Sequence, residues 1–264
     1  MTIAPTARFI GLSLASALLA APAFAEATLR FEEATARSPG SAAELYREQH
    51  WLRSDGDHPI ERLVLYRCPD GTPFARKRID YRASATAPTF LFDDLRSGYR
   101  EGLRRGATTA LFFRANNQTA ERSAPVGSTQ LVADAGFDEF IRQQWATLVA
   151  GKTLPLQFAV PSRLRSMAFS VSRAGEAQVA GEKAWVFRLK LSGLLGLVAP
   201  AIDVSYGQQS HRLLRFEGLS NLRDDAGDKP LVARIDFAPR VLAATEAQWR
   251  SALQAPLSAC RVGR

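Results

Sequence analysis

The sequence predicts a β-dominated α+β protein with a curved, half-barrel-like antiparallel sheet, one central helix and a short C-terminal helix. Short runs with the period-two alternation of half-buried strands recur in both halves of the chain, between turns rich in Gly, Pro, Asn and Asp. Helical spacing of apolar residues is confined to two internal segments. Residues 26–264 have the length of one large β domain, so we expect a single domain after residues 1–25.

The N-terminal half has the pattern of an antiparallel meander between Leu29 and Ser123. Turn sequences such as Pro69-Asp70-Gly71 separate its runs. After a first run from Leu29, we expect strands over Glu44 to Arg53, Ile60 to Arg67, Phe74 to Ala83, Thr89 to Phe92, Leu95 to Leu103, Thr108 to Ala115 and Thr119 to Ser123.

A helix is expected from Ala135 to Ala150. Asp134 is suited to cap its first free backbone amides, and Gly151 to end it. Apolar side chains recur at four- and three-residue spacing, which is typical of packing against a sheet; they are Phe137, Ile141, Trp145 and Leu148. A partner-binding helix is the alternative.

The strand pattern returns from Leu156 to Phe237. Trp185, Phe187, Leu189 and Leu191 alternate with Val186, Arg188 and Lys190, so we expect the two sets on opposite faces of one strand. A second alternating run begins at Leu231. A short amphipathic helix from Thr245 to Leu253 then closes the chain.

The first 25 residues have the features of a secretory signal peptide. Arg8 precedes an apolar stretch from Phe9 to Leu19, and Ala23-Phe24-Ala25 matches a cleavage site. The stretch is shorter than the about 20 residues of a membrane span. No Cys near the cut could accept a lipid. We therefore expect a periplasmic or secreted protein without a transmembrane span.

The chain has two cysteines, Cys68 and Cys260. An oxidising compartment favours a disulfide between them, which would tie the C-terminal tail to the domain. Two unpaired buried thiols are the alternative.

The chain is basic, with a formal net charge of +8, and most of its cationic side chains are arginines. An exported chain seldom meets nucleic acid, so a partner for this charge would be an anionic lipid or another envelope component. Codon bias and a solvated surface explain the same excess.

No motif with catalytic spacing occurs in the sequence. His50, His58 and His211 stand apart, without the clustering of a zinc site, so we expect no metal and no cofactor. Neither a nucleophile elbow nor a glycine-rich phosphate loop is present. A catalytic group assembled from distant strands would leave no local trace, so an enzyme stays open.

The run from Leu95 to Arg104 is a candidate anion site. Gly98 and Gly102 disfavour a helix, and in a strand the three guanidinium groups of Arg96, Arg100 and Arg104 would share one face. Guanidinium groups suit phosphate and carboxylate oxygens. A solvated sheet edge is the alternative.

The segment from Gly193 to Ile202 is apolar and uncharged, and its two glycines and one proline disfavour a regular helix. An apolar loop needs a cover, either the sheet itself or a lipid. The apolar ligand-binding residues predicted from this segment and the preceding strand are Leu194, Leu195, Leu197, Val198, Trp185 and Phe187.

With these features the chain resembles the periplasmic lipid- and lipoprotein-carrier superfamily, the LolA/LolB-like group. The resemblance rests on the leader, the meander, the helix at Ala135 to Ala150 and the apolar loop. It implies a half-barrel whose concave apolar face binds acyl chains. The missing lipid-acceptor cysteine points to the soluble branch.

We therefore expect a non-catalytic envelope protein that binds a lipid or other amphiphile, with arginines near an anionic head group and peripheral contact with a membrane. Two alternatives stay open. One is an envelope hydrolase with a dispersed active site, and the other is an interaction module for an envelope protein partner.

Overall fold

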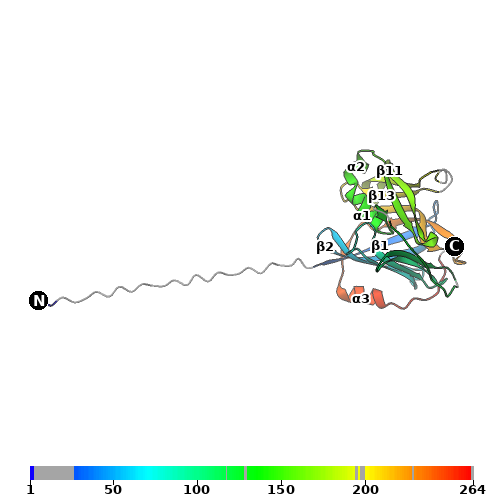
Figure 1. Ribbon diagram of the computed structural model, residues 1–264, viewed down its shortest axis with the longest axis horizontal. Coiled ribbons are helices and arrows are strands. Elements are labelled where there is room, and N and C mark those ends of the chain that lie inside the picture. Colours follow the sequence, from blue (N-terminus) through cyan, green and yellow to red (C-terminus); the bar gives the residue numbers. More distant parts are fainter. Residues whose placement is uncertain are drawn as a thin grey trace.

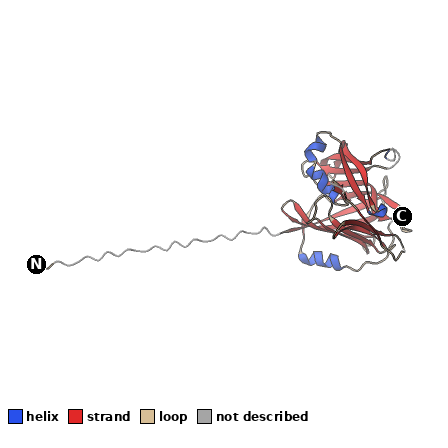
Figure 2. Ribbon diagram, viewed as in Figure 1, coloured by secondary structure: helices blue, strands red, loops and turns tan. Residues whose placement is uncertain are grey.

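The computed structural model describes residues 1–2, 27–116, 118–127, 130–193, 196, 200–227 and 229–262. The predicted signal peptide lies almost wholly outside these residues. The described part consists mainly of strands, with α1 and α2 beside β11 and β13 in the upper part of the view and α3 below β1 and β2 (Figure 1). Strands dominate both parts (Figure 2).

Sixteen strands are present in the described residues. Their bounds are β1 Thr28–Arg37, β2 Glu44–Asp55, β3 His58–Arg67, β4 Pro73–Asp80, β5 Thr89–Asp94, β6 Tyr99–Arg105, β7 Thr109–Arg114, β8 Arg122–Pro125, β9 Leu131–Val132, β10 Leu154–Val160, β11 Arg165–Val179, β12 Glu182–Leu191, β13 Ile202–Gly207, β14 Leu213–Arg223, β15 Pro230–Phe237 and β16 Leu242–Ala243. The helices are α1 Gly136–Gln143, α2 Trp145–Val149 and α3 Glu246–Gln254, with a 3-10 turn, η1, at Pro161–Arg163.

All sixteen strands belong to one sheet. Its order runs from β8 through β7 to β1, continues through β15, β14 and so on to β10, and ends at β9, with β16 also paired to β1. Neighbours are antiparallel, apart from the parallel pair of β9 and β10. The N-terminal meander, β1 to β8, and the C-terminal strands therefore meet at the β1–β15 pair. The β-dominated fold predicted from the alternating runs is confirmed.

The sheet curves so that its far ends approach each other. Leu103 and Leu111 of β6 and β7 pack in one cluster with Leu131 of β9 and Ala159 of β10. The Ala133 amide donates a hydrogen bond to the Thr86 carbonyl, which joins the chain after β9 to the loop before β5. This curvature gives the sheet an inner and an outer face.

The C-terminal helix covers part of the outer face. Thr245 caps α3 with a capping box to Gln248, as its position before the apolar pattern suggests. Ala252 of the helix packs with Trp51, Leu63 and Leu65 of β2 and β3. The predicted short C-terminal helix is confirmed.

The central helix differs from the prediction of one continuous element. It breaks at Gln144 into α1 and α2. Ala135 occupies the capping position, which has no side-chain cap, but Asp134 Oδ1 accepts a hydrogen bond from the Ala135 amide at 2.8 Å, so Asp134 does bind a backbone amide at the helix start. Asp134 has a left-handed backbone, with φ of 47°, and its carboxylate turns toward the inner face of the sheet. Its other oxygen, Oδ2, accepts a hydrogen bond from Lys77 there.

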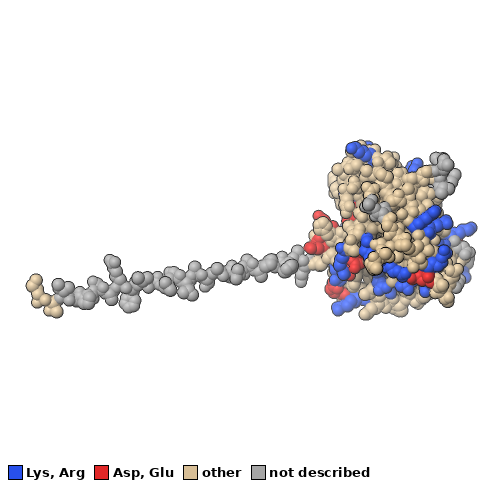
Figure 3. Space-filling view, viewed as in Figure 1, with Lys and Arg blue, Asp and Glu red and all other residues tan. Residues whose placement is uncertain are grey.

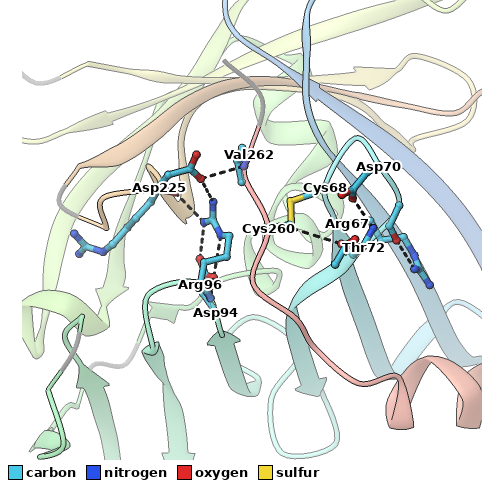
Figure 4. The surroundings of a disulfide bond; sticks show 11 residues. Arg67, Cys68, Asp70, Thr72, Asp94, Arg96, Asp225, Cys260 and Val262 are labelled. Carbon is cyan, nitrogen blue, oxygen red and sulfur yellow. Dashed lines mark hydrogen bonds and ion pairs between the residues drawn. A yellow bond between two sulfur atoms is a disulfide. The ribbon is translucent and has the colours of Figure 1, made fainter.

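The predicted disulfide between Cys68 and Cys260 is present and joins residues 192 apart in the chain. Beside it, Arg96 binds Asp94 and Asp225, and Asp225 accepts a hydrogen bond from the Val262 amide at 3.0 Å (Figure 4). The disulfide and this ion-pair chain hold the tail against the sheet. In the described part of the chain, no helix is long and apolar enough to cross a membrane.

Candidate functional site: a central cavity with two unlike walls

A cavity of about 400 Å³ lies against the inner face of the sheet. That volume falls within the range of about 300–1,000 Å³ typical of small-molecule sites. Strands of both halves and the start of α1 line it. Its two walls differ in chemistry, because strands β2 to β6 supply charged and aromatic side chains whereas β10 and β12 to β15 supply mainly apolar ones, apart from polar residues such as Asn221 and Arg223 near the end of β14.

The strand register brings the charged residues of the first wall together. Paired residues project from the same face of a sheet. One inner row contains His50, Val64, Lys77, Phe92 and Glu101 on five neighbouring strands. The next row contains Glu48, Tyr66, Ala75, Asp94 and Tyr99. We call the cavity-lining residues Glu48, His50, Arg62, Tyr66, Lys77, Tyr99 and Glu101 the polar wall.

Two buried ion pairs tie the polar wall to the segment that begins α1. Lys77 Nζ lies 2.7 Å from Asp134 Oδ2, and the two side chains are 9% and 4% exposed. Arg62 Nη2 lies 3.2 Å from Asp138 Oδ2. Arg142 of α1 binds the same Asp138 oxygen at 3.1 Å. Both cations of the wall are therefore paired with carboxylates from the segment that covers it.

Two further carboxylates of the wall have other partners. Glu101 accepts hydrogen bonds from the Tyr99 hydroxyl at 2.6 Å and from Asn221 Nδ2 at 3.1 Å. Glu48 Oε2 lies 2.8 Å from His50 Nε2. The other ring nitrogen, His50 Nδ1, is buried and has no hydrogen-bond partner in the described structure. A buried polar atom without a partner is uncommon in a folded protein.

The local field of the polar wall is negative around Tyr66. Burial raises the pKa of the Tyr66 hydroxyl well above its usual range, and the charges of Glu48, Asp134 and Glu101 raise it further. Burial also raises the pKa of Glu101, and the nearby Asp134 carboxylate adds to that shift. Three carboxylates therefore act on one small region of the cavity.

The second wall is apolar. It includes Phe137 of α1 and the residues Phe158, Leu189, Ile202, Val204, Leu213, Phe216, Ile235 and Phe237. Register joins it to the polar wall through β1, where Ala34 pairs with Phe237 on one side and with Glu48 on the other. Ala34 and Ala36 are small and buried, so the middle of the sheet leaves room between the walls.

Burying the charges of the polar wall in the protein interior costs hydration free energy. Each buried ion loses several kcal/mol of hydration, and replacing a buried pair with apolar residues often leaves stability unchanged or raises it. A wall of this kind beside an apolar one is therefore better explained by ligand recognition than by stability.

Of the predicted apolar ligand-binding residues, only Trp185 and Phe187 are among the described residues. Leu194, Leu195, Leu197 and Val198 fall outside the described residues. Phe187 is fully buried and contacts the rings of Trp145 and Tyr206. Trp185 packs in the same cluster beneath the guanidinium of Arg173. Neither aromatic residue lines the central cavity, and both occupy packing positions.

The three arginines predicted to share one face of a strand are not together in the structure. The expected strand from Leu95 is wrong over its first four residues, because residues 95–98 form a turn in which Gly98 has φ of 67°. Arg96 is buried there, and its nitrogens bind Asp94, Asp225 and the Arg223 carbonyl. Arg96 therefore holds the tail rather than standing beside the other two arginines.

Arg100 and Arg104 do share one face of β6, as predicted. They border a groove of about 640 Å³, which we call the outer groove; it is also lined by Arg78, Leu91, Phe112 and Trp249. Arg100 lies 3.3 Å from Asp93, and Arg104 lies 2.7 Å from Glu121. Binding of anionic groups there stays a prediction. On the face drawn in Figure 3, most Lys and Arg atoms lie below the largely uncharged part that carries α1 and α2.

Sequence reasoning missed the polar wall, although the strands contain a signal for it. Tyr46, Glu48 and His50 alternate along β2 on the same face. Arg62 and Lys77 occupy corresponding alternate positions in β3 and β4. Charged residues at alternate positions normally indicate a solvated face. Here these residues lie on the inner face of the curved sheet, where they are buried, so the charges are interior.

No family model matches the chain, and no curated protein matches it. Among solved structures, a beta-barrel-like protein of domain of unknown function DUF1849 from Brucella abortus is 9% identical, with a TM-score of 0.46, covering 83% of this chain and 98% of that one. A DUF1329 family protein from Desulfovibrio piger is 10% identical, with a TM-score of 0.27 and coverage of 87% and 92%. These likenesses assign no family and no activity.

Proposed function

We propose that the protein is an exported envelope protein that binds an amphiphile in the central cavity, with the hydrocarbon chain against the apolar wall and the head group against the polar wall. The observation that carries this proposal is the contrast between the two walls of one cavity. An apolar pocket with a few polar groups at one side is typical of small-molecule sites. The disulfide between Cys68 and Cys260 supports export, because such bonds persist in oxidising compartments.

The placement of the cavity also supports the carrier-like function implied by the resemblance to lipid carriers. Its lining comes from strands far apart in the sequence, from β2 to β15, and from α1, which covers the inner face. Under this proposal, the main binding site is the central cavity and not the apolar segment from Gly193 to Ile202. Leu219 lies at the margin of the cavity, since it lines the cavity while remaining 37% exposed.

Binding explains the Glu48–His50 pair better than hydrolysis does. A hydrolase built on this pair would need a nucleophile within hydrogen-bond reach of the base. In the described structure His50 bonds to Glu48 alone, and no hydroxyl or thiol contacts its other nitrogen. No group of His, Cys, Asp and Glu residues suited to a metal ion occurs among the described residues either.

The proposal is tested with the neutral fluorescent probe N-phenyl-1-naphthylamine. We expect the wild-type protein to enhance its fluorescence in a saturable way and a dodecyl amphiphile below its micelle concentration to displace it. Leu219→Trp places a large ring at the cavity margin and should weaken probe binding by about tenfold or more, since it removes space at the site. Leu242→Trp, the same change at an exposed position on β16, should leave binding unchanged.

Native mass spectrometry of protein purified from the compartment to which it is exported provides a second measurement. A co-purifying amphiphile supports the proposal. Absence of probe binding together with absence of any bound amphiphile would overturn it. Turnover in an esterase panel that is lost in His50→Gln would support the hydrolase instead.

A further inference from the structure

We propose that the polar wall selects an amphiphile with an amine head group, and that Glu48 and Glu101 receive its ammonium. This inference rests on the proposed function and specifies its ligand class. It differs from the expectation of arginines beside an anionic head group, because the arginines named in that expectation do not line the cavity.

The cations of the cavity lining already have partners. Lys77 binds Asp134, and Arg62 binds Asp138. The guanidinium of Arg223 lies over the Tyr99 ring at 4.6 Å from its centroid. Arg62 Nε is a buried donor without a partner, but it belongs to a guanidinium whose charge the Asp138 carboxylate compensates. An anionic head group would therefore compete with carboxylates already in place.

The carboxylates of Glu48 and Glu101 are less fully paired with cations. Glu101 is held by two neutral donors, Tyr99 and Asn221, and has no ion pair. Glu48 bonds to His50, which is a cation only when protonated. A carboxylate has about four lone-pair positions, so both residues retain acceptor capacity. The surroundings of Glu48 and Glu101 therefore contain too little positive charge to pair with both carboxylates.

His50 provides an independent indication of what the ligand brings. If its Nε2–H donates to Glu48, the unpartnered Nδ1 is an acceptor. His50 lines the cavity in the same row as Glu101. In this tautomer, the open position on His50 requires a hydrogen-bond donor. A primary ammonium supplies three donors and one positive charge.

The charge balance also disfavours phosphate and carboxylate head groups. Glu48 and Glu101 both act on Tyr66, so an anion placed beside that ring would meet two carboxylates that have no Arg or Lys partner among the described residues. Like-charge contacts at a binding surface cost several kcal/mol. An ammonium at the same position would instead reduce the cost of keeping these carboxylates buried.

The test compares dodecylammonium, dodecanoate and uncharged dodecyl maltoside as competitors of N-phenyl-1-naphthylamine at pH 7.5, below their micelle concentrations. We expect dodecylammonium to compete at least about tenfold better than dodecanoate, because only the anion meets like charge. Glu101→Gln and Glu48→Gln should each reduce this preference. Glu121→Gln, on the outer groove, is the matched control and should preserve it.

The outcomes separate the two proposals. If none of the three compounds displaces the probe, the proposed function itself fails. If they displace it but dodecanoate competes equally or better, amphiphile binding stands and the amine preference is wrong. A preference that survives both glutamate substitutions in folded protein, verified by circular dichroism, also overturns the assignment of Glu48 and Glu101.

Discussion

The two walls of the central cavity belong to one sheet and follow the same strand alternation, yet their inward-facing side chains differ in polarity and charge. In β12 and β13, and at Leu213 and Phe216 of β14, the inner positions are aliphatic or aromatic, and they pack with α1 and α2. In β2 to β6 the buried inner positions include five charged residues and one histidine, namely Glu48, His50, Arg62, Lys77, Asp94 and Glu101. Apolar burial stabilises the first region at about 25 cal/mol per Å². Burial of the charges in the second region costs hydration instead.

The comparison also shows how the segment from β9 to α1 joins the two regions. Phe137 of α1 packs against Phe158 of β10 on the apolar side. Asp134 and Asp138 of the same segment bind Lys77 and Arg62 on the polar side. A single short segment therefore completes both walls, and its carboxylates make the buried cations of the polar wall tolerable.

The largest expected effect comes from breaking one of these ion pairs. Lys77→Met leaves the Asp134 carboxylate buried without its cation, and such a change costs about 3–5 kcal/mol in the free energy of unfolding. The double variant Lys77→Met/Asp134→Asn removes both charges and should recover most of that loss. Urea unfolding monitored by tryptophan fluorescence measures both. A single variant as stable as the wild type would show that the pair does not support the segment from β9 to α1.

A smaller effect, of opposite sign, is expected from Glu101→Gln. The pKa of Glu101 is raised by burial above its ordinary value of 4.5, so the folded state holds this proton more tightly than the unfolded state. The resulting loss of stability is absent below the ordinary pKa and grows as pH rises through the raised pKa. Glu101→Gln should therefore be more thermostable than wild type at pH 8.

The difference in melting temperature between Glu101→Gln and wild type should narrow as pH falls toward 4.5. Differential scanning fluorimetry across this range measures it. A difference independent of pH would mean that the substitution acts through packing or through the Tyr99 and Asn221 hydrogen bonds rather than through the charge of Glu101.

The smallest effect on stability is expected outside the cavity, at the outer groove. Arg100 and Arg104 are 36% and 51% exposed and form surface ion pairs, which are each worth about 0–1 kcal/mol. Arg100→Gln/Arg104→Gln should change melting temperature little and leave probe binding in the cavity unchanged. Cosedimentation with vesicles containing phosphatidylglycerol tests the predicted anion site; unchanged binding of the double variant would contradict it.

Much of the fold followed from local patterns in the sequence. Alternation and turn residues predicted most strands of the meander, and Thr245 with the apolar spacing after it predicted α3. The strand expected from Leu95 failed because a positive φ at Gly98 permits a turn that alternation does not reveal. The helix expected from Ala135 to Ala150 failed in its continuity, because spacing describes a face and not the backbone at Gln144.

By itself, the sequence determined the β-dominated class and the order of most elements, because these depend on local periodicity, and it favoured a disulfide that the structure then showed. The tertiary structure alone decided which alternate residues face inward. Glu48, Lys77 and Glu101 lie on separate strands, and curvature of the sheet and the cover from α1 bring them to one cavity. A charged residue at an alternate position looks the same in sequence whether its face meets water or a second layer, since burial depends on distant segments.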